Sequence, residues 1–326
     1  MLTENRTLLF LMLLLSSLLG AACRKDKIDL AVFRELPRAA SDDLSAVWFT
    51  DSLHGVVTGG RIWQRGVILS TSDGGENWAT DTVLANKMEC VMFDPEGQGY
   101  VCGLDGLLLH RPPGQTHWDV FRTDWRWHRA CYFPDGQRGV VVSGEGYRNG
   151  QVRLFGPDAF WQFDSLQVFP NELHAVWFSD SLSVHAAGYG WMMRSGDGGA
   201  HWERLPVPGD FYRSIHFPTP LTGYACGYQG TLLKTTDGGH SWQTIREGAA
   251  AGRKNRPFRA LWFADAEQGW LVGEGGIFWA TTDGGRSWQA VDGAPADANF
   301  TDVFVRDGGK GWITAENGRI FYFEQR

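Results

Sequence analysis

Four aspartates in one recurring sequence context are the first residues of this 326-residue chain that could do chemistry. Each lies in the pattern S/T-x-D-G-G-x-x-W, in the segments Thr71–Trp78, Ser195–Trp202, Thr235–Trp242 and Thr281–Trp288. Two carboxylates held across a groove could hydrolyse a glycoside. Asp-Gly-Gly is equally a turn sequence, because glycine adopts positive φ and the aspartate side chain bonds nearby backbone N–H groups. We therefore predict that these Asp-box residues are structural: Asp73, Trp78, Asp197, Trp202, Asp237, Trp242, Asp283 and Trp288.

Three arginines and a histidine form a second group, since each stands directly before a small residue that opens an apolar run. Aromatic residues lie next to them in the sequence, among them Trp127, Phe211, Tyr212 and Phe258. Arginine guanidinium groups over aromatic rings suit carboxylate-bearing partners, such as a peptide C-terminus. The sequence therefore predicts a partner-binding patch made of Arg126, Trp127, Arg129, His174, Tyr212, Arg213 and Arg259.

The tryptophans that close the repeats set the spacing of the elements that carry these residues. They recur about every 40 residues, at Trp78, Trp118, Trp161, Trp202, Trp242 and Trp288. The copies at Trp118 and Trp161 lack Asp-Gly-Gly. Each unit holds short apolar or aromatic runs separated by glycines, without long helical periodicity. A period near 40 with four short strands per unit is typical of propeller blades.

The two ends of the chain indicate how the ring closes. A seventh unit follows Trp288 and stops one strand short, whereas Leu30–Leu36 is an additional strand before the first unit. Pairing these two ends would leave neither strand edge open. We therefore predict an all-β, seven-bladed β-propeller of four-stranded blades over residues 29–326, closed by the N-terminal strand.

Alignment of the units predicts where the cationic residues lie. The innermost strand of each blade begins at the small residue, so the residue before it lies near the mouth of the central channel. In blade order this residue is Ser45, Glu89, Arg129, His174, Arg213, Arg259 and Thr301. The arginines could form a binding patch, or they could pair with carboxylates of the same face, for which we name Asp105, Glu145, Glu274 and Glu316. Two longer loops, 144–150 and 248–256, extend this face, either as binding loops or as solvated ones.

The first residues resemble a bacterial lipoprotein signal. Leu8–Leu19 is apolar but too short to span a membrane, and Gly20-Ala21-Ala22-Cys23 follows it. In such proteins the cysteine carries lipid and becomes the first mature residue. We therefore expect a signal peptide over residues 1–22, lipidation of Cys23, a tether over residues 23–28, and an exported domain anchored in the cell envelope on its periplasmic or surface side. Plain secretion and a retained, uncleaved anchor are the alternatives.

Net charge and cysteine spacing limit the classes of partner and ligand that the chain is expected to bind. The net charge of −7 argues against nucleic acid or an anionic membrane surface as the main partner. The cysteines at 90, 102, 131 and 226 lack the spacing of a metal site, so we expect no metal and no cofactor. A hairpin turning near Glu96 would bring Cys90 and Cys102 face to face, as a disulfide or as small buried side chains.

The G-x-x-G turn, the apolar strand and T-x-D-G-G-x-x-W together resemble the photosystem II assembly and stability factor-like propellers. That family lies within the wider group of Asp-box, or bacterial-neuraminidase-repeat, propellers, and the resemblance covers Leu30 to Arg326. It implies a seven-bladed, non-enzymatic scaffold that binds a protein or peptide partner and assists assembly of an envelope complex, which is photosystem II in photosynthetic members. It also implies that an arginine patch meets the client.

A glycan-binding or sialidase-like propeller is the alternative function from the same wider group. A sialidase needs a three-arginine cluster, a nucleophilic tyrosine with a glutamate partner, an acid/base aspartate and six blades. The Arg-Ile-Pro signature is absent, and Phe33-Arg34-Glu35-Leu36-Pro37 echoes it only loosely. No pair of carboxylates stands out as a glycosidase pair. We therefore expect a monomer without enzymatic activity.

Overall fold

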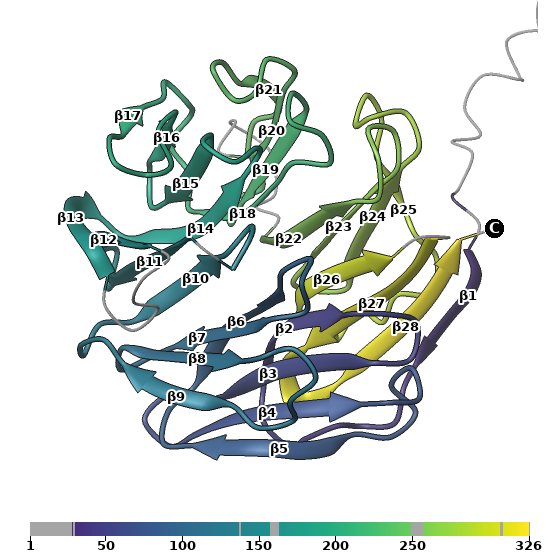
Figure 1. Ribbon diagram of the computed structural model, residues 1–326. Coiled ribbons are helices and arrows are strands. Elements are labelled where there is room, and N and C mark those ends of the chain that lie inside the picture. The colour runs from purple at the N-terminus through teal and green to yellow at the C-terminus, as the bar shows by residue number, and fades with distance from the viewer. Residues whose placement is uncertain are drawn as a thin grey trace, which may run out of the picture.

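The computed structural model describes residues 28, 30–136, 138–156, 163–248, 257–306 and 309–325. Within these residues the chain forms seven four-stranded antiparallel sheets around a common axis (Figure 1). Innermost strands of neighbouring sheets contact one another all the way round the ring. The protein is an all-β, seven-bladed β-propeller, as predicted.

Three sequence expectations fall on residues that are not described: the signal peptide with Cys23, Trp161, and loop residues 249–256. Among the described residues, the helical element is a short 3-10 turn, η2 (Glu316–Gly318). No helix in this part of the chain is long and apolar enough to cross a membrane.

Each blade runs from an inner strand at the channel to an outer strand at the surface. The first three blades contain β2 (Leu44–Phe49), β3 (Gly55–Arg61), β4 (Arg65–Thr71) and β5 (Ala79–Leu84); β6 (Met88–Phe93), β7 (Gly99–Gly103), β8 (Leu107–Arg111) and β9 (Asp119–Arg122); and β10 (His128–Tyr132), β11 (Gly139–Glu145), β12 (Arg148–Phe155) and β13 (Phe163–Asn171).

The next three blades repeat this order. They contain β14 (Leu173–Phe178), β15 (Val184–Gly188), β16 (Met192–Ser195) and β17 (Glu203–Arg204); β18 (Tyr212–His216), β19 (Gly223–Gly227), β20 (Leu232–Thr235) and β21 (Gln243–Arg246); and β22 (Phe258–Phe263), β23 (Gly269–Gly273), β24 (Ile277–Thr281) and β25 (Gln289–Ala290).

The seventh blade joins the two ends of the chain. Its strands are β26 (Phe300–Arg306), β27 (Lys310–Ala315), β28 (Ile320–Gln325) and, outermost, β1 (Leu30–Glu35). Phe33 lies opposite Phe323 in the β1–β28 pair, and both Glu35 oxygens accept bonds from Arg319 at 2.9 Å. Leu36 N–H then donates to the Ile320 carbonyl at 2.8 Å. The predicted closure is confirmed, and β28 is not left as an open edge.

A β-bulge near the start of every inner strand decides which side chains face the channel. In all seven blades the pairing register with the second strand shifts across the bulge residue: Ser45, Glu89, Arg129, His174, Arg213, Arg259 or Thr301. A bulge leaves its extra residue outside the ladder and redirects the side chain. The residue before each bulge is fully buried: Leu44, Met88, His128, Leu173, Tyr212, Phe258 or Phe300.

Bulky side chains close the channel below its mouth. They stand three residues after each bulge: Trp48, Met92, Tyr132, Trp177, His216, Trp262 and Phe304. Their rings touch across the axis, with centroids 5.7 Å apart for Trp48–Trp262 and 5.8 Å apart for Trp177–Trp262. We call this set the aromatic plug.

The four Asp boxes form the turns between third and fourth strands. In the turn at Thr235, the threonine hydroxyl accepts from Gly239 N–H at 3.0 Å and donates to Asp237 at 2.7 Å, and Asp237 also accepts from Ser241 N–H at 3.0 Å. The same bonds recur in the turns at Thr71, Ser195 and Thr281. These contacts are all within the turn itself.

The closing tryptophans cover the turns and contact the end of the inner strand. The Trp78, Trp242 and Trp288 rings meet Phe49, Phe217 and Phe263 edge-on at 5.8 to 6.2 Å. The Trp202 indole instead donates to the Gly199 carbonyl at 2.9 Å. The tryptophans therefore join each turn to the core of its own blade.

Neighbouring blades are tied by aromatic residues on the second strands. Trp312 of the seventh blade stacks on Phe49 of the first at 3.7 Å and donates from its indole nitrogen to Gly74 of that blade's Asp box at 3.0 Å. Tyr224 does the same for Phe263 and Gly284, at 3.6 and 2.9 Å. The Asp boxes thus also hold the ring of blades together.

Candidate functional site

The predicted cationic residues meet at one mouth of the central channel. Arg129, His174, Arg213 and Arg259 line a single cavity of about 190 Å³, together with Ser45, Glu89 and Thr301. The bulges place them there, since the residues before the bulges are buried and those at the bulges line the channel. We call this the channel mouth. Alignment of the units therefore correctly predicted that cationic side chains up to 130 residues apart in the chain (129 and 259) lie together.

The aromatic plug forms the floor of this cavity. Trp48, Met92 and Tyr132 also line a second cavity, of about 760 Å³, with residues from the opposite ends of the inner strands. The plug lies between the two cavities. A group that enters the channel mouth therefore meets a floor of rings under a collar of charges.

Two of the three arginines at the mouth are paired. Arg129 lies 3.1 Å from Glu89 and 2.7 Å from Glu172, and Arg259 pairs with Glu274. Local pairing, one of the two interpretations left open, thus holds for Arg129 and Arg259. Of the acids named for it, only Glu274 pairs with an arginine of the mouth.

The other three acids named from the sequence lie elsewhere. Asp105 pairs with Arg122 at 2.8 Å. Glu316 accepts from Asn299 at 2.8 Å, and Glu145 lies opposite Arg148 in the β11–β12 hairpin. None of these contacts reaches the channel mouth.

Arg213 is different, because it makes no ion pair with any residue that the structure describes. Its guanidinium lies over the Phe211 ring at 5.0 Å, and its Nε is buried without a hydrogen-bond partner in the described chain. Burial, reinforced by the charge of Arg259, lowers the pKa of Arg213 to about 10. The side chain therefore stays protonated at neutral pH and lacks a counter-ion of its own.

The remaining charges of the mouth leave a positive excess. His174 is neutral, because burial and the neighbouring charge of Arg213 hold its pKa well below the usual value. Lys87 pairs with Glu89 at 3.4 Å. Four cations (Lys87, Arg129, Arg213 and Arg259) thus face the three carboxylates that form ion pairs here (Glu89, Glu172 and Glu274). Asp302 also lines the cavity, but burial raises its pKa to about 7, so it is only partly ionised at neutral pH. An anionic group would balance the mouth.

Exposed aromatic side chains lie beside the mouth. Trp63, Tyr147 and Tyr189 are 61, 56 and 44 % exposed. Trp127 links this set to the mouth, since it lies 6.0 Å from Trp63 and beneath Arg129 at 4.8 Å. On the other side, Tyr147 and Tyr189 lie 5.8 and 5.9 Å from Phe211. We call these residues, with Phe211, the aromatic rim.

Two aromatic residues expected at the rim are not there. Tyr212 and Phe258 immediately precede bulge residues, and both are fully buried between blades. The Tyr212 hydroxyl donates to the Pro208 carbonyl, away from the patch. The assignment of Tyr212 to the binding patch was therefore wrong. Arg126 lies nearby, partly buried, with its N–H donating to Asp124 at 2.7 Å and its carbonyl accepting from Gly106.

The sequence missed the polar residues that hold the rim in place. Trp63 and Tyr147 have positive φ, 59° and 69°, in turns between second and third strands. Their N–H groups donate to buried side chains of the loops that enter the inner strands, namely Asn86 and Glu172, both at 2.8 Å. Positive φ costs free energy for such bulky residues, so these bonds keep the rings in an otherwise unfavourable turn. An Asn or Glu one to three residues before the inner strand was the available signal.

Comparisons with known proteins point to one family. Residues 201–296 match the family described as photosynthesis system II assembly factor YCF48. The photosystem II assembly protein Ycf48 of Thermosynechococcus vestitus is 29 % identical over 184 residues, which are 52 % of this chain and 51 % of that protein. A photosystem II assembly lipoprotein Ycf48 of a Synechococcus species is 28 % identical over 182 residues, 52 % of this chain and 53 % of that protein. The chain thus spans about half the length of the curated relatives that it matches.

Solved structures share the fold. YCF48 from Cyanidioschyzon merolae superposes with a TM-score of 0.68 at 14 % identity, covering 90 % of this chain and 99 % of that one. A structure of YCF48 bound to D1 peptide gives 0.70 at 16 % identity, covering 92 % and 99 %. The expected resemblance to the photosystem II assembly factor-like propellers is confirmed.

Proposed function

We propose, from this resemblance and the charge of the channel mouth, that the protein is a non-enzymatic scaffold that binds a carboxylate-bearing peptide or protein at this mouth. The unpaired guanidinium of Arg213 carries the proposal, because it offers hydrogen-bond donors and a positive charge in the wall of an open cavity. The anion would be a peptide C-terminus or an acidic side chain. Assistance to the assembly of an envelope complex would follow from holding such a segment.

The chemistry of the rim supports a protein partner over a small ion. Tyrosine, tryptophan and arginine are the residues that most often dominate binding energy at protein interfaces. Here they lie beside a cavity of about 190 Å³, which admits one anionic group while the rest of a peptide lies on exposed rings. Trp63, Tyr147 and Tyr189 are the anchors that we assign to the peptide flanks.

The relatives support the same class of partner. The two curated relatives described above are named as assembly proteins, and one solved relative is described as bound to D1 peptide. We carry over a peptide partner from these names, not the identity of the peptide. The partner of this chain is proposed by chemistry alone.

The experiment is a binding titration with a matched pair of peptide pools. Fluorescent peptides of random sequence, one pool with a free C-terminal carboxylate and one amidated, are titrated with the mature domain. Loss of one charged hydrogen bond costs about 1.5–3 kcal/mol, so Arg213→Ala should weaken binding of the carboxylate pool roughly 10- to 100-fold. Arg286→Ala, on an exposed outer turn, removes the same charge and should leave binding unchanged.

Two results would contradict this function. Equal losses for Arg213→Ala and Arg286→Ala would mean that only net charge matters. The second result is a complete absence of peptide binding. Neither pool would bind, and a photoreactive residue placed at Tyr189 would cross-link no acidic peptide from envelope fractions. This result would rule out the peptide-binding function altogether.

Export and lipid anchoring complete the proposal. The Synechococcus relative is named a lipoprotein, and residues 1–23 of this chain resemble a lipoprotein signal. We therefore assign an anchor to Cys23 and a tether to residues 23–28. A Cys23→Ala variant should leave the membrane fraction, and its persistence there after a carbonate wash would argue against the anchor.

No observation favours the sialidase-like alternative. The three glutamates of the mouth lie within ion-pair distance of arginine or lysine. Hydrogen bonds from Asn77 and Thr71 lower the pKa of Asp73 to about 2, which is unsuitable for a general acid. Hydrolysis of a sialoside by the purified protein would overturn this view.

A further inference from the structure

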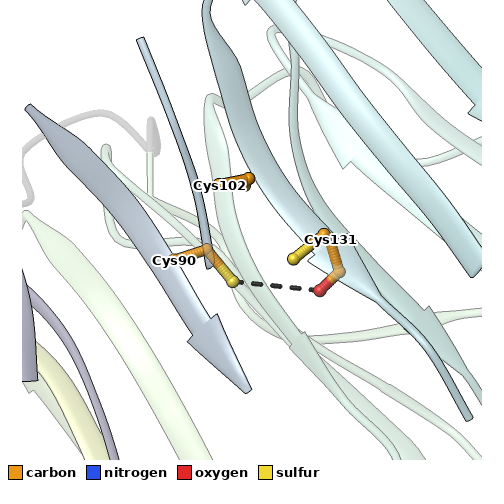
Figure 2. A group of neighbouring side chains, drawn as sticks. All are labelled: Cys90, Cys102 and Cys131. Atoms are coloured by element: carbon orange, nitrogen blue, oxygen red, sulfur yellow. Dashed lines mark hydrogen bonds between the residues drawn. The ribbon is translucent and has the colours of Figure 1, made fainter. Parts of the chain in front are cut away.

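Three cysteines from two blades come together beside the channel. Cys90 on β6 lies directly opposite Cys102 on β7, as the sequence predicted, and Cys131 reaches them from β10 of the next blade (Figure 2). The three sulfur atoms lie within 4.8 Å of one another. All three are free thiols, and the Cys90 thiol donates a long bond to the Cys131 carbonyl at 3.8 Å.

The cluster is buried on one side and reachable from the other. Cys102 is fully buried and Cys131 is 3 % exposed. Cys90 and Cys131 nevertheless line the cavity of the channel mouth, whereas Cys102 lies behind them. A small ion in the channel mouth therefore has two of the three cysteines in the wall of its cavity and the third behind them.

The set of ligand atoms selects the kind of ion. The group consists of three sulfur atoms within 4.8 Å of one another, and among the described residues no histidine or carboxylate lies close enough to be a fourth ligand. Thiolates prefer soft cations, whereas zinc sites built by proteins are almost always four-coordinate. A trigonal ion with metal–sulfur bonds of about 2.3 Å would set the sulfurs about 4.0 Å apart, inside the observed limit. We propose that Cys90, Cys102 and Cys131 bind one copper(I) ion as a three-thiolate site.

The surrounding charges suit such a site. Each thiol that ligates the ion loses its proton to solvent, so three thiolates around a monovalent cation carry excess negative charge. The channel mouth supplies opposite charge, because its four cations outnumber the three carboxylates that form ion pairs with them.

The other blades show that the fold does not require these cysteines. At the position of Cys90 they carry Ala46, Ala130, Ala175, Ser214, Ala260 and Asp302, and at that of Cys131 they carry Val47, Val91, Val176, Ile215, Leu261 and Val303. At the position of Cys102 they carry Thr58, Val142, Ala187, Cys226, Val272 and Thr314. The earlier expectation of no metal site rested on spacing along the chain, which cannot register ligands gathered from three strands.

Cys226 provides a matched control inside the same chain. It is fully buried at the position on β19 that Cys102 occupies on β7, but its partner across the pair is Ser214. It therefore reproduces the burial and strand position of Cys102 without the cluster. Cys226→Thr and Cys102→Thr make the same chemical change in the two blades.

The experiment titrates the reduced mature domain with copper(I), supplied anaerobically as its bicinchoninate complex. We expect one ion per chain, and loss of a ligand in Cys90→Ala, Cys102→Thr or Cys131→Val should weaken binding at least about tenfold. Each substitution introduces the residue that another blade carries at the same position, so the fold should survive. Thermal unfolding curves recorded with and without copper(I) check this. The ion should raise the unfolding temperature of the parent and of Cys226→Thr, but not that of the cluster variants.

Four results would overturn the proposal. They are no copper(I) taken from the competitor, equal weakening by Cys226→Thr, tighter binding of zinc than of copper(I), and a Cys90–Cys102 disulfide in the protein isolated from cells. None of these depends on the peptide-binding function, since Arg213→Ala leaves all three sulfur ligands in place and should still bind one copper(I) ion per chain.

Discussion

Asp302 is a carboxyl group that lines the channel. It stands where four blades carry alanine, and its oxygens accept from Val47 N–H at 3.0 Å and Val303 N–H at 2.9 Å. No cation pairs with it among the described residues. Burial raises the pKa of this carboxyl to about 7, although the two backbone bonds act to lower it.

This shift predicts a stability that falls as pH rises. An aspartate in the unfolded chain titrates near 3.9, so between about pH 4 and pH 7 the unfolded state has lost the proton that the folded state keeps. The protonated carboxyl therefore contributes its full share to the free energy of unfolding below about pH 4, and this contribution is lost as the pH rises to 7. The substitution Asp302→Ser copies Ser214 of the fifth blade and removes the carboxyl. Between pH 5 and pH 8 the free energy of unfolding of this variant should therefore rise by about 2–3 kcal/mol relative to that of the parent.

Urea unfolding at the two pH values measures this difference. Asp297→Ser, which removes an 80 % exposed carboxyl of the same blade, is the control. Parallel pH profiles for the parent and Asp302→Ser would mean that the carboxyl is ionised in the folded protein.

At the scale of the element, the Asp-box turn depends on the hydroxyl that opens it. Thr235 is 2 % exposed, and its Oγ1 accepts from Gly239 N–H while donating to Asp237. Valine has the same shape but leaves the buried N–H of Gly239 without an acceptor, which typically costs 1–3 kcal/mol. We expect Thr235→Val to lower the free energy of unfolding by about that amount.

Thr236→Val separates this bond from the change of residue type. Thr236 is exposed next to Thr235, so the same substitution should change stability by less than about 0.5 kcal/mol. The two variants are compared by denaturant unfolding at one pH. If both cost the same, the hydroxyl bond is not what holds the turn.

The inner strands mark how far the sequence could predict the site. The repeat gave the position of Arg129, Arg213 and Arg259, because a position that recurs at each blade start keeps its place in the ring. It did not predict the burial of Tyr212 and Phe258, because the bulge directs the side chain of the preceding residue into the core. The residues at this position are apolar in six blades, which was an unused signal for burial.

Contacts between distant segments could not be predicted for a different reason. Glu172 is a single residue of a loop, yet it holds both Arg129 and the turn of Tyr147. The cysteine cluster likewise depends on how two blades pack. Among the described residues, neither the Glu172–Arg129 ion pair nor the cysteine cluster repeats from blade to blade, so the period that predicts the fold carries no information about them. The bond from a turn N–H to a polar residue just before an inner strand does recur, at Asp43, Asn86, Glu172, Asp210 and Asn299.

For the whole molecule, a ring of repeated blades needs one joint between its ends. β1 supplies this joint by covering β28, where Phe33 stacks on Phe321 at 5.8 Å and Leu36 is 4 % exposed. Burial of Leu36 alone corresponds to about 2–5 kcal/mol by the cost of leucine-to-alanine changes. The first blade also depends on the joint, since Leu36 and Trp312 lie in one core cluster with Phe49.

Deletion of residues 30–36 therefore tests the closure directly. The shortened chain should unfold at lower denaturant concentration, and its exposed β28 edge should promote self-association, because open strand edges pair with other chains. Unfolding curves and light scattering after size exclusion report the two effects, with a chain that begins at residue 28 as the control. A shortened chain that stays monomeric and unfolds with the control would mean that six complete blades and three strands close without β1.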